Sequence, residues 1–188
     1  MSLGKVFSLV LLATVALLLM LPATPVEAQV LCRDTNSSVE ATTPSADFTQ
    51  HGDGTVTHHI TGLMWMRCSL GQSWDGDVCS GNAELLAWPH ISFAVERFNA
   101  EGGFAGHEDW RMPTRDELVS IVEHRCASPS INGIIFPNTP RTRFLTASAE
   151  ENDKSKPWYV YFDNGYVGKG YVGARGAIRL VRTVPSEK

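Results

Sequence analysis

Four cysteines, all placed after residue 28, constrain this chain more than any other feature of its sequence. An even number of cysteines implies disulfide bonds when a protein folds in an oxidising compartment. Four cysteines allow three pairings. Cys68 and Cys79 enclose a short loop rich in Gly, Asp and Ser, and closing such a loop contributes about 3 kcal/mol. We therefore predict the pair Cys68–Cys79, which leaves Cys32–Cys126 to tie the N-terminal part of the chain to the body. A metal site or a redox pair would favour a C-x-x-C spacing, and the sequence has none.

The N-terminal residues 1–28 have the pattern of a secretory signal peptide. Lys5 supplies the positive charge typical of the first part of a signal peptide, and residues 6–21 are almost entirely apolar. Val26-Glu27-Ala28 then offers small residues for cleavage. The alternative is an uncleaved membrane anchor, but the apolar run is shorter than the ~20 residues that cross a bilayer. We therefore expect a secreted, periplasmic or cell-surface protein that meets a membrane only through this segment before cleavage. The residues before Cys32 lack the small residue of a lipoprotein signal.

Composition excludes two further classes of protein. The chain has 188 residues, 43% of them hydrophobic and 19% charged, which is too apolar for a disordered chain and long enough for one domain. Its formal net charge of −4 gives no basic field, so we expect no nucleic-acid partner.

The order of local patterns predicts a single α+β domain behind an extended arm at residues 29–46. Strands are expected at 55–59 and 63–67, and a helix is expected from Trp88 to Phe98 with Gly102-Gly103 as its stop. A second helix is expected within 108–126, where Thr114 and Glu117 form a capping box and Leu118, Ile121, Val122 and Arg125 share one face. Residues 127–157 are predicted to be irregular. A hairpin follows, with a strand at 158–162, a type I′ turn signal at Asp163-Asn164-Gly165 and a return strand that begins at Tyr166-Val167. The last strand is predicted at 177–184.

Several segments together resemble a known family. They are GDGTVTHHITGLMWMRC, GQSWDGDVC, the Trp88 helix, GHEDWRMPTRDELVSIV, SPSINGIIFPNTP, WYVYFDNG and the closing IRLVR. In order and spacing the set resembles the Lcl C-terminal domain family, named for a bacterial collagen-like adhesin, and implies a domain over residues 47–184. WRMPTRDEL with IRLVR is also distantly similar to segments of formylglycine-generating enzymes. The resemblance implies a C-type-lectin-like fold with two helices and small antiparallel sheets.

No catalytic, cofactor or metal motif stands out in the sequence. The adjacent His58 and His59 point to opposite faces of a strand and cannot share a metal, and no calcium-dependent sugar motif is present. Asp109, Trp110, Arg111 and Thr114 are better explained as a structural network than as a site. We expect a non-catalytic binding module without a cofactor. The alternative is a degenerate or unfamiliar enzyme of the formylglycine-generating type, which would need reactive cysteines in the C-terminal part of the domain, and none follows Cys126.

Positive charge gathers late in the chain and suggests where a ligand would bind. Residues 111–182 carry eleven Lys and Arg against seven Asp and Glu. Guanidinium groups suit sulfate and carboxylate, and aromatic rings can stack on sugars. We therefore predict an anionic glycan or a surface protein as the partner, and any oligomer would form without a collagen-like stalk. The predicted ligand-binding residues are Arg141, Arg143, Lys154, Lys156, Trp158, Tyr159, Lys169 and Arg175.

Overall fold

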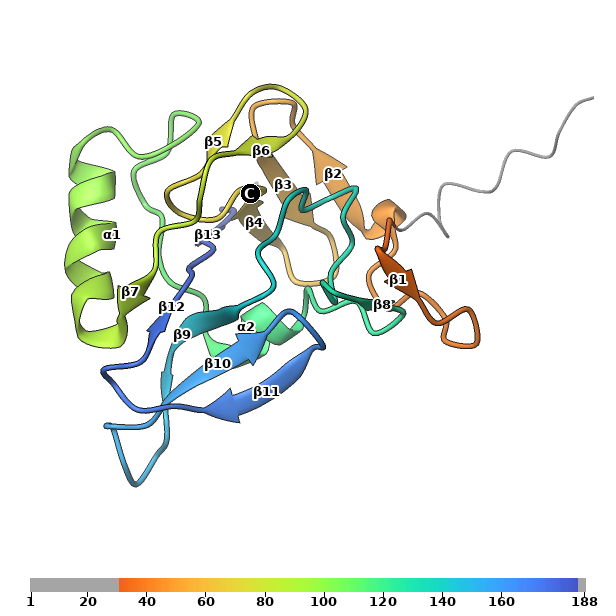
Figure 1. Ribbon diagram of the computed structural model, residues 1–188. Helices are drawn as coiled ribbons and strands as arrows, with labels where there is room; N and C mark the ends of the chain where they lie inside the picture. Colours follow the sequence, from red (N-terminus) through yellow and green to blue (C-terminus); the bar gives the residue numbers. More distant parts are fainter. Residues whose placement is uncertain (1–30, 186–188) are drawn as a thin grey trace, which may run out of the picture.

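The computed structural model describes residues 31–185, so the predicted signal peptide and residues 29–30 lie outside the described part. Within it, α1 (Ile91–Ala100) and α2 (Arg115–Val119) accompany several small antiparallel sheets, which confirms the α+β class (Figure 1). The C-type-lectin-like arrangement stays a prediction. None of the helices in residues 31–185 is both long and apolar enough to cross a membrane.

The largest sheet has the strand order β13-β4-β3-β2. Its strands are β2 (Phe48–Gln50), β3 (Thr55–His58), β4 (Leu63–Met66) and β13 (Val181–Thr183). Val56 and Trp65 face each other across β3 and β4, and both are fully buried. Because side chains alternate along a strand, this pair fixes which face of the sheet covers the core. The two strands predicted around the turn Thr61-Gly62 are confirmed.

A three-stranded sheet of β9 (Arg143–Ala149), β10 (Pro157–Tyr161) and β11 (Tyr166–Lys169) lies beside α2. The prediction that residues 127–157 are irregular was wrong for β9, because Phe144 and Leu145 are buried and pair with β10. The predicted hairpin is confirmed by the pairing of β10 with β11, but its type I′ turn, which needs a positive φ at two successive residues, was wrong. Tyr161 pairs with Tyr166, so the loop has the four residues 162–165, and only Gly165 among them has a positive φ, of 74°.

Three two-stranded ladders complete the strands. They pair β1 (Asp34–Thr35) with β8 (Cys126–Ala127), β5 (Ser73–Trp74) with β6 (Cys79–Ser80), and β7 (Leu86–Ala87) with β12 (Arg175–Gly176). Of the predicted last strand, 177–184, only residues 181–183 form a strand, β13, and β12 lies just before the predicted start. Residues 178–180 between them are fully buried, and the carbonyls of Ile178 and Leu180 accept hydrogen bonds from Leu70 and Met66. Arg179 is buried together with Ile178 and Leu180, because this segment runs through the interior.

Helix α2 begins where the sequence predicts but is short, and α1 begins at Ile91 rather than at the predicted Trp88. A 3-10 turn, η3 (Trp88–His90), leads into α1, and Gly102 follows the helix with a φ of 104°. The capping box of Thr114 and Glu117 is present at α2. The helix ends at Val119 rather than near Cys126, because the following residues turn back to form β8. Ile121 and Val122 are nonetheless buried, so their pattern predicted burial correctly and helix extent wrongly.

Both predicted disulfides are present, and no cysteine is free. Cys68–Cys79 closes the loop that carries β5, and Cys32–Cys126 fastens the N-terminal arm beside β8. The rest of the arm includes a second 3-10 turn, η2 (Ser45–Asp47).

The arm is also fastened by a buried carboxylate. Glu123 is fully buried and accepts hydrogen bonds from the backbone and hydroxyl groups of Thr42 and Thr43 and from the amide of Arg125. Arm and body are therefore joined by covalent and polar contacts as well as by β1.

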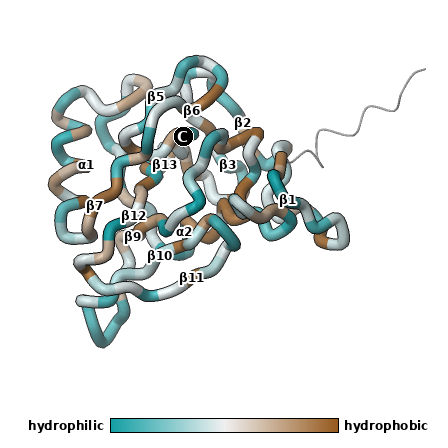
Figure 2. The backbone as a smooth tube through the Cα atoms, viewed as in Figure 1, coloured by the Kyte–Doolittle hydropathy of each residue, from teal (hydrophilic) through white to brown (hydrophobic). Residues whose placement is uncertain are grey.

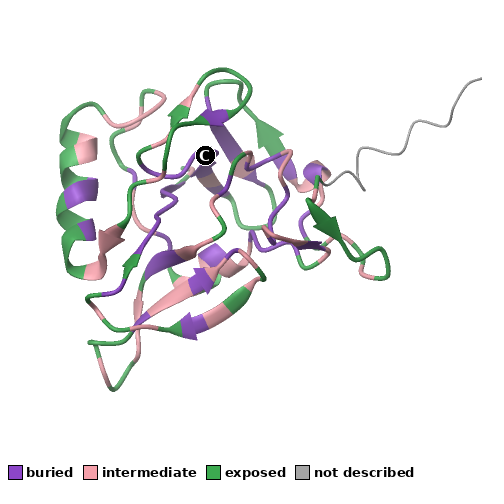
Figure 3. Cartoon of the chain, in the orientation of Figure 1, coloured by how far each residue is buried: buried purple, intermediate pink, exposed green. Residues whose placement is uncertain are grey.

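The hydrophobic core lies between the sheets. One cluster includes Trp65, Phe136, Phe144 and Phe162, and a second includes Trp110 against α1. Hydrophobic segments gather at the centre of the molecule in Figure 2, and the same segments are largely buried in Figure 3. Helix α1 covers one side and turns its other face to solvent.

Candidate functional site

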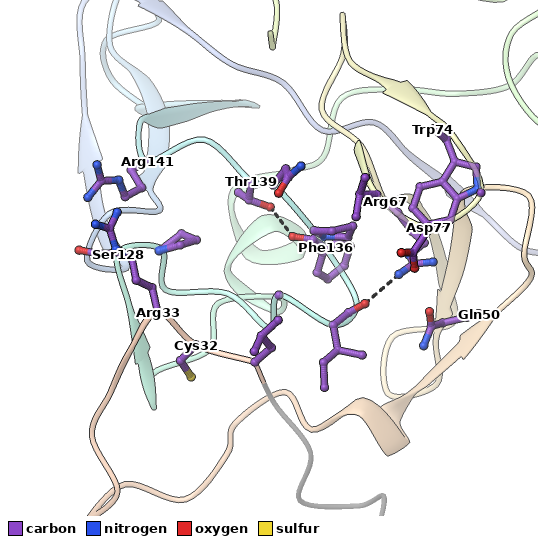
Figure 4. Close-up of a pocket in the computed structure, with 18 of the residues that line it drawn as sticks. Cys32, Arg33, Gln50, Arg67, Trp74, Asp77, Ser128, Phe136, Thr139 and Arg141 are labelled. Carbon is purple, nitrogen blue, oxygen red and sulfur yellow. Dashed lines mark hydrogen bonds between the residues drawn. The ribbon is translucent and has the colours of Figure 1, made fainter. Parts of the chain in front are cut away.

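A groove with a volume of about 1090 Å³ opens between the loop closed by Cys68–Cys79 and the segment 128–141. We call it the arginine groove, defined by Arg33, Arg67, Arg141, Trp74 and Asp77, which all line it. Figure 4 shows Arg33 and Arg141 on one side and Arg67 with Trp74 on the other. Among its lining residues these three arginines face a single carboxylate, that of Asp77. The groove therefore carries an excess of positive charge.

Arg67 is held in a fixed orientation. Its Nε donates to the carbonyl of Ile135 at 2.8 Å and its Nη2 to that of Ile134 at 2.7 Å. The guanidinium also lies 4.3 Å from the centre of the Trp74 ring, a cation–π contact. Burial lowers the pKa of Arg67, and attraction to Asp77 partly offsets this effect.

One terminal nitrogen of Arg67 is left for a ligand. Within residues 31–185, Nη1 has no protein hydrogen-bond partner, and no carboxylate oxygen lies within 4.0 Å of the guanidinium. The side chain is thus both pre-oriented and free to donate into the groove.

Another arginine, Arg179, does not line the groove but supports it from below. Arg179 is fully buried, and its Nη2 donates to the hydroxyl of Thr139 at 2.7 Å, while Nη1 donates to the carbonyls of Met66 and Arg67. Its guanidinium packs against the rings of Phe136 and Phe144. Burial lowers the pKa of Arg179. Because Thr139 lines the groove and Arg67 forms part of its wall, Arg179 fixes the base of the site from within.

The eight residues predicted to bind a ligand lie on separate surfaces, and binding by them stays a prediction. Arg141 alone lines the arginine groove. Trp158 and Tyr159 are successive residues of β10, so their side chains point to opposite faces. The guanidinium carbon of Arg143 lies 5.4 Å from the centre of the Tyr159 ring. Arg175 donates to the carbonyl of Leu85 at 3.0 Å.

The charges around Trp158 are balanced. The Trp158 ring has Arg115 at 4.9 Å and Lys169 at 4.8 Å from its centre. Lys169 pairs with Glu150, and Lys156 pairs with Glu150 and, at 3.0 Å, with Asp153. Hydrogen bonds from Ser155 and Lys156 lower the pKa of Asp153 to about 2. Lys154 is exposed in the same loop. Acidic neighbours therefore offset much of the positive charge that led us to predict ligand binding at this surface.

Sequence reasoning missed Arg33, Arg67 and Trp74 as candidate residues. They come from the arm, the end of β4 and the disulfide-closed loop, which are far apart in the chain. The only local signal was the position of Arg33 and Arg67 next to cysteines, which places both residues beside a disulfide.

The expected structural network is present at the start of α2. Arg182 donates to both carboxylate oxygens of Asp109, Trp110 is buried, and Arg111 makes a two-pronged ion pair with Glu117 at 2.7 and 2.8 Å. These contacts connect the segment before α2 with the last strand and with the helix cap.

The Arg111–Glu117 pair makes stability depend on pH. The hydrogen bonds from Arg111 hold the pKa of Glu117 below its ordinary value, despite partial burial. A lowered folded-state pKa stabilises the fold above the unfolded pKa of about 4.3, and this stabilisation is lost as the pH falls through the folded pKa. We therefore expect the free energy of unfolding, measured by chemical unfolding between pH 2 and 6, to fall less steeply with decreasing pH in Glu117→Gln than in wild type. Parallel curves would contradict the assignment, and Glu151→Gln serves as an exposed control.

The adjacent histidines His58 and His59 have different surroundings. His58 is buried and stacks on Phe48 at 4.5 Å, whereas His59 is exposed and bonds the hydroxyl of Thr49 at 2.7 Å. Across residues 31–185, no group of three or more His, Cys, Asp or Glu side chains is placed to hold a metal ion.

A family model matches most of the chain. The family model described as the Lcl C-terminal domain matches residues 54–182, which include most of the predicted domain and the wall that carries Arg67 and Trp74. A search of curated proteins finds no match to the chain.

Proposed function

The chain belongs to the Lcl C-terminal domain family, and from this premise we propose that it is a non-catalytic adhesion module that binds an anionic glycan in the arginine groove. The family suggests an adhesion-related role. The glycan and the groove are assigned here from the chemistry of the lining residues.

The observation that carries the proposal is the set of three guanidinium groups in a groove with one carboxylate. Planar guanidinium groups form paired hydrogen bonds with sulfate and carboxylate, the acidic groups of anionic glycans. Arg67 is already oriented by two carbonyls and an indole ring, so little side-chain freedom is lost when its Nη1 donates to a ligand.

The proposed location is outside the cytoplasm. Two disulfides, and no membrane-spanning helix among the described residues, are compatible with a secreted or extracellular protein. The signal peptide predicted at residues 1–28 would supply export.

The binding test compares the groove with the balanced basic surface. Wild type is expected to be retained on a sulfated-polysaccharide column at low salt and released as salt rises, because the Debye length falls from ~10 Å at 0.1 M to ~3 Å at 1 M. Arg33→Ala/Arg141→Ala should bind about tenfold more weakly, since two exposed ion pairs contribute about 1.4 kcal/mol together.

A matched variant gives the control. Arg143→Ala/Lys156→Ala removes the same charge from outside the groove and should elute close to wild type. If this control loses retention while the groove variant keeps it, the glycan binds the surface around Tyr159 and Lys156 instead. No retention of wild type at low salt would refute glycan binding, and a surface protein would become the partner to test.

The proposal also requires that the cysteines be unreactive. All four sulfur atoms are paired, so thiol titration of the unfolded, unreduced protein should find no free thiol. A reactive thiol together with bound copper would instead favour the formylglycine-generating alternative.

A further inference from the structure

Strand β1 and the exposed turn after it carry the residues Asp34-Thr35-Asn36-Ser37-Ser38. Asn36-Ser37-Ser38 has the form Asn-Xaa-Ser, the acceptor pattern of N-linked glycosylation in exported proteins, and it occurs once in the sequence. We propose that Asn36 is an N-glycosylation site, modified by an oligosaccharyltransferase after export.

The structure presents Asn36 to solvent on an anchored turn. Residues 33–38 are all exposed, and the loop after β1 projects from the body in Figure 1 and is largely exposed in Figure 3. The backbone amide of Asn36 donates to the carbonyl of Arg125 at 2.9 Å, and its carbonyl accepts from the amide of Val39 at 3.1 Å. The turn is thus accessible to an enzyme and fixed to the domain at its base.

The side-chain contacts match the chemistry that the modification needs. The hydroxyl of Ser38 donates to Oδ1 of Asn36 at 2.6 Å, and the amide of Ser38 donates to the same oxygen at 3.1 Å. Both bonds stabilise the negative charge that develops on the carboxamide oxygen when Nδ2 loses a proton. Nδ2 itself has no protein partner among residues 31–185, so the reacting nitrogen is free.

Other asparagines lack this combination. Asn132 is fully buried, with its Nδ2 donating to the carbonyl of Thr43 and the hydroxyl of Ser45. Asn164 is exposed, but Tyr166 occupies the position where the acceptor pattern requires a hydroxyl residue.

The reaction needs an oligosaccharide donor linked to a lipid through pyrophosphate. Nδ2 attacks the anomeric carbon, a carbon–nitrogen bond forms, and the bond from that carbon to the phosphate oxygen breaks. The lipid pyrophosphate leaves with the electron pair, and a base on the enzyme takes the proton from Nδ2. No electron transfer is involved. Asn36 does not line the arginine groove, so the inference is independent of the proposed function.

The test is export of the full chain in cells that contain a bacterial oligosaccharyltransferase and its lipid-linked donor. The enzyme should be of the class that requires an acidic residue two positions before asparagine, a requirement that Asp34 meets. Intact-mass measurement should show a gain of one oligosaccharide, and peptide mapping should place it on Asn36. Asn36→Gln and Ser38→Ala should each lose the added mass.

Ser37→Ala is the matched control, because it changes the same turn at the position where the pattern accepts other residues, and it should keep the glycan. A reporter protein with the same five residues in a flexible tail shows that the enzyme is active. If the reporter is modified and the wild-type chain is not, the proposal is overturned. Modification that survives Asn36→Gln would overturn it too.

Discussion

Replacing Cys32 and Cys126 by alanine is expected to lower the free energy of unfolding by about 4–5 kcal/mol. The two cysteines are 94 residues apart, so their bond closes a long loop and removes many conformations from the unfolded chain. It also fastens the arm whose residues Leu31, Cys32 and Arg33 line the groove. Urea unfolding of the oxidised proteins, followed by tryptophan fluorescence, measures the change.

The second disulfide provides the comparison. Cys68 and Cys79 are separated by 11 residues, and by the same chain-entropy argument Cys68→Ala/Cys79→Ala should cost about 3 kcal/mol. Each variant loses one disulfide bond. Cys32 is only partly buried while the other three cysteines are buried, so side-chain burial favours a smaller loss from the long loop and any larger loss reflects loop length. A larger loss from the short loop than from the long one would contradict the expected order.

Glu123→Ala is expected to cost about 3–5 kcal/mol, the range found when one partner of a buried charged interaction is removed. The carboxylate receives five hydrogen bonds, four of them from Thr42 and Thr43. Truncation leaves the amides of Thr42, Thr43 and Arg125 and the hydroxyl of Thr43 without partners, whereas the hydroxyl of Thr42 keeps the carbonyl of Val122. Each unsatisfied buried group costs about 1–3 kcal/mol before relaxation. Thermal unfolding and limited proteolysis of the arm should both report the loss.

Two controls define the role of this carboxylate. Glu151→Ala removes an exposed carboxylate and should change the free energy of unfolding by less than about 0.5 kcal/mol. Because Glu123 and the Cys32–Cys126 bond hold the same arm, combining Glu123→Ala with Cys32→Ala/Cys126→Ala should cost less than the sum of the two losses. Full additivity would show that the two contacts act on separate parts of the fold.

Local sequence patterns predicted much of the fold, but features that depend on contacts between distant segments were missed. The capping box at Thr114, the helix after Trp88 and the short disulfide loop depend on residues close in sequence. Strand β9 was missed because its place depends on pairing with β10, whereas the prolines around it dominate the local pattern. Arg179 was predicted to lie in the last strand, but it lies between β12 and β13. Its guanidinium packs against phenyl rings and donates to carbonyls that come from other segments.

The candidate site was harder to predict for the same reason. The basic residues 141–175 were grouped because they are near in sequence, yet strand alternation alone places Trp158 and Tyr159 on opposite faces. The acidic residues that neutralise Lys156 and Lys169 were visible beside them. In contrast, no sequence pattern brings Arg33 of the arm, Arg67 just after β4 and Arg141 to one groove, because that requires the complete fold.

The position of the two disulfides has a consequence for the thermodynamics of binding. One bond holds the side of the groove that carries Arg33, and the other holds the loop that carries Trp74 and Asp77. With both sides covalently restrained, a ligand would find the groove in nearly its final shape, and little conformational entropy would be lost on association. Opening either bond would leave the same charges in place but add that entropic cost, so affinity would fall without any change in the residues that touch the ligand.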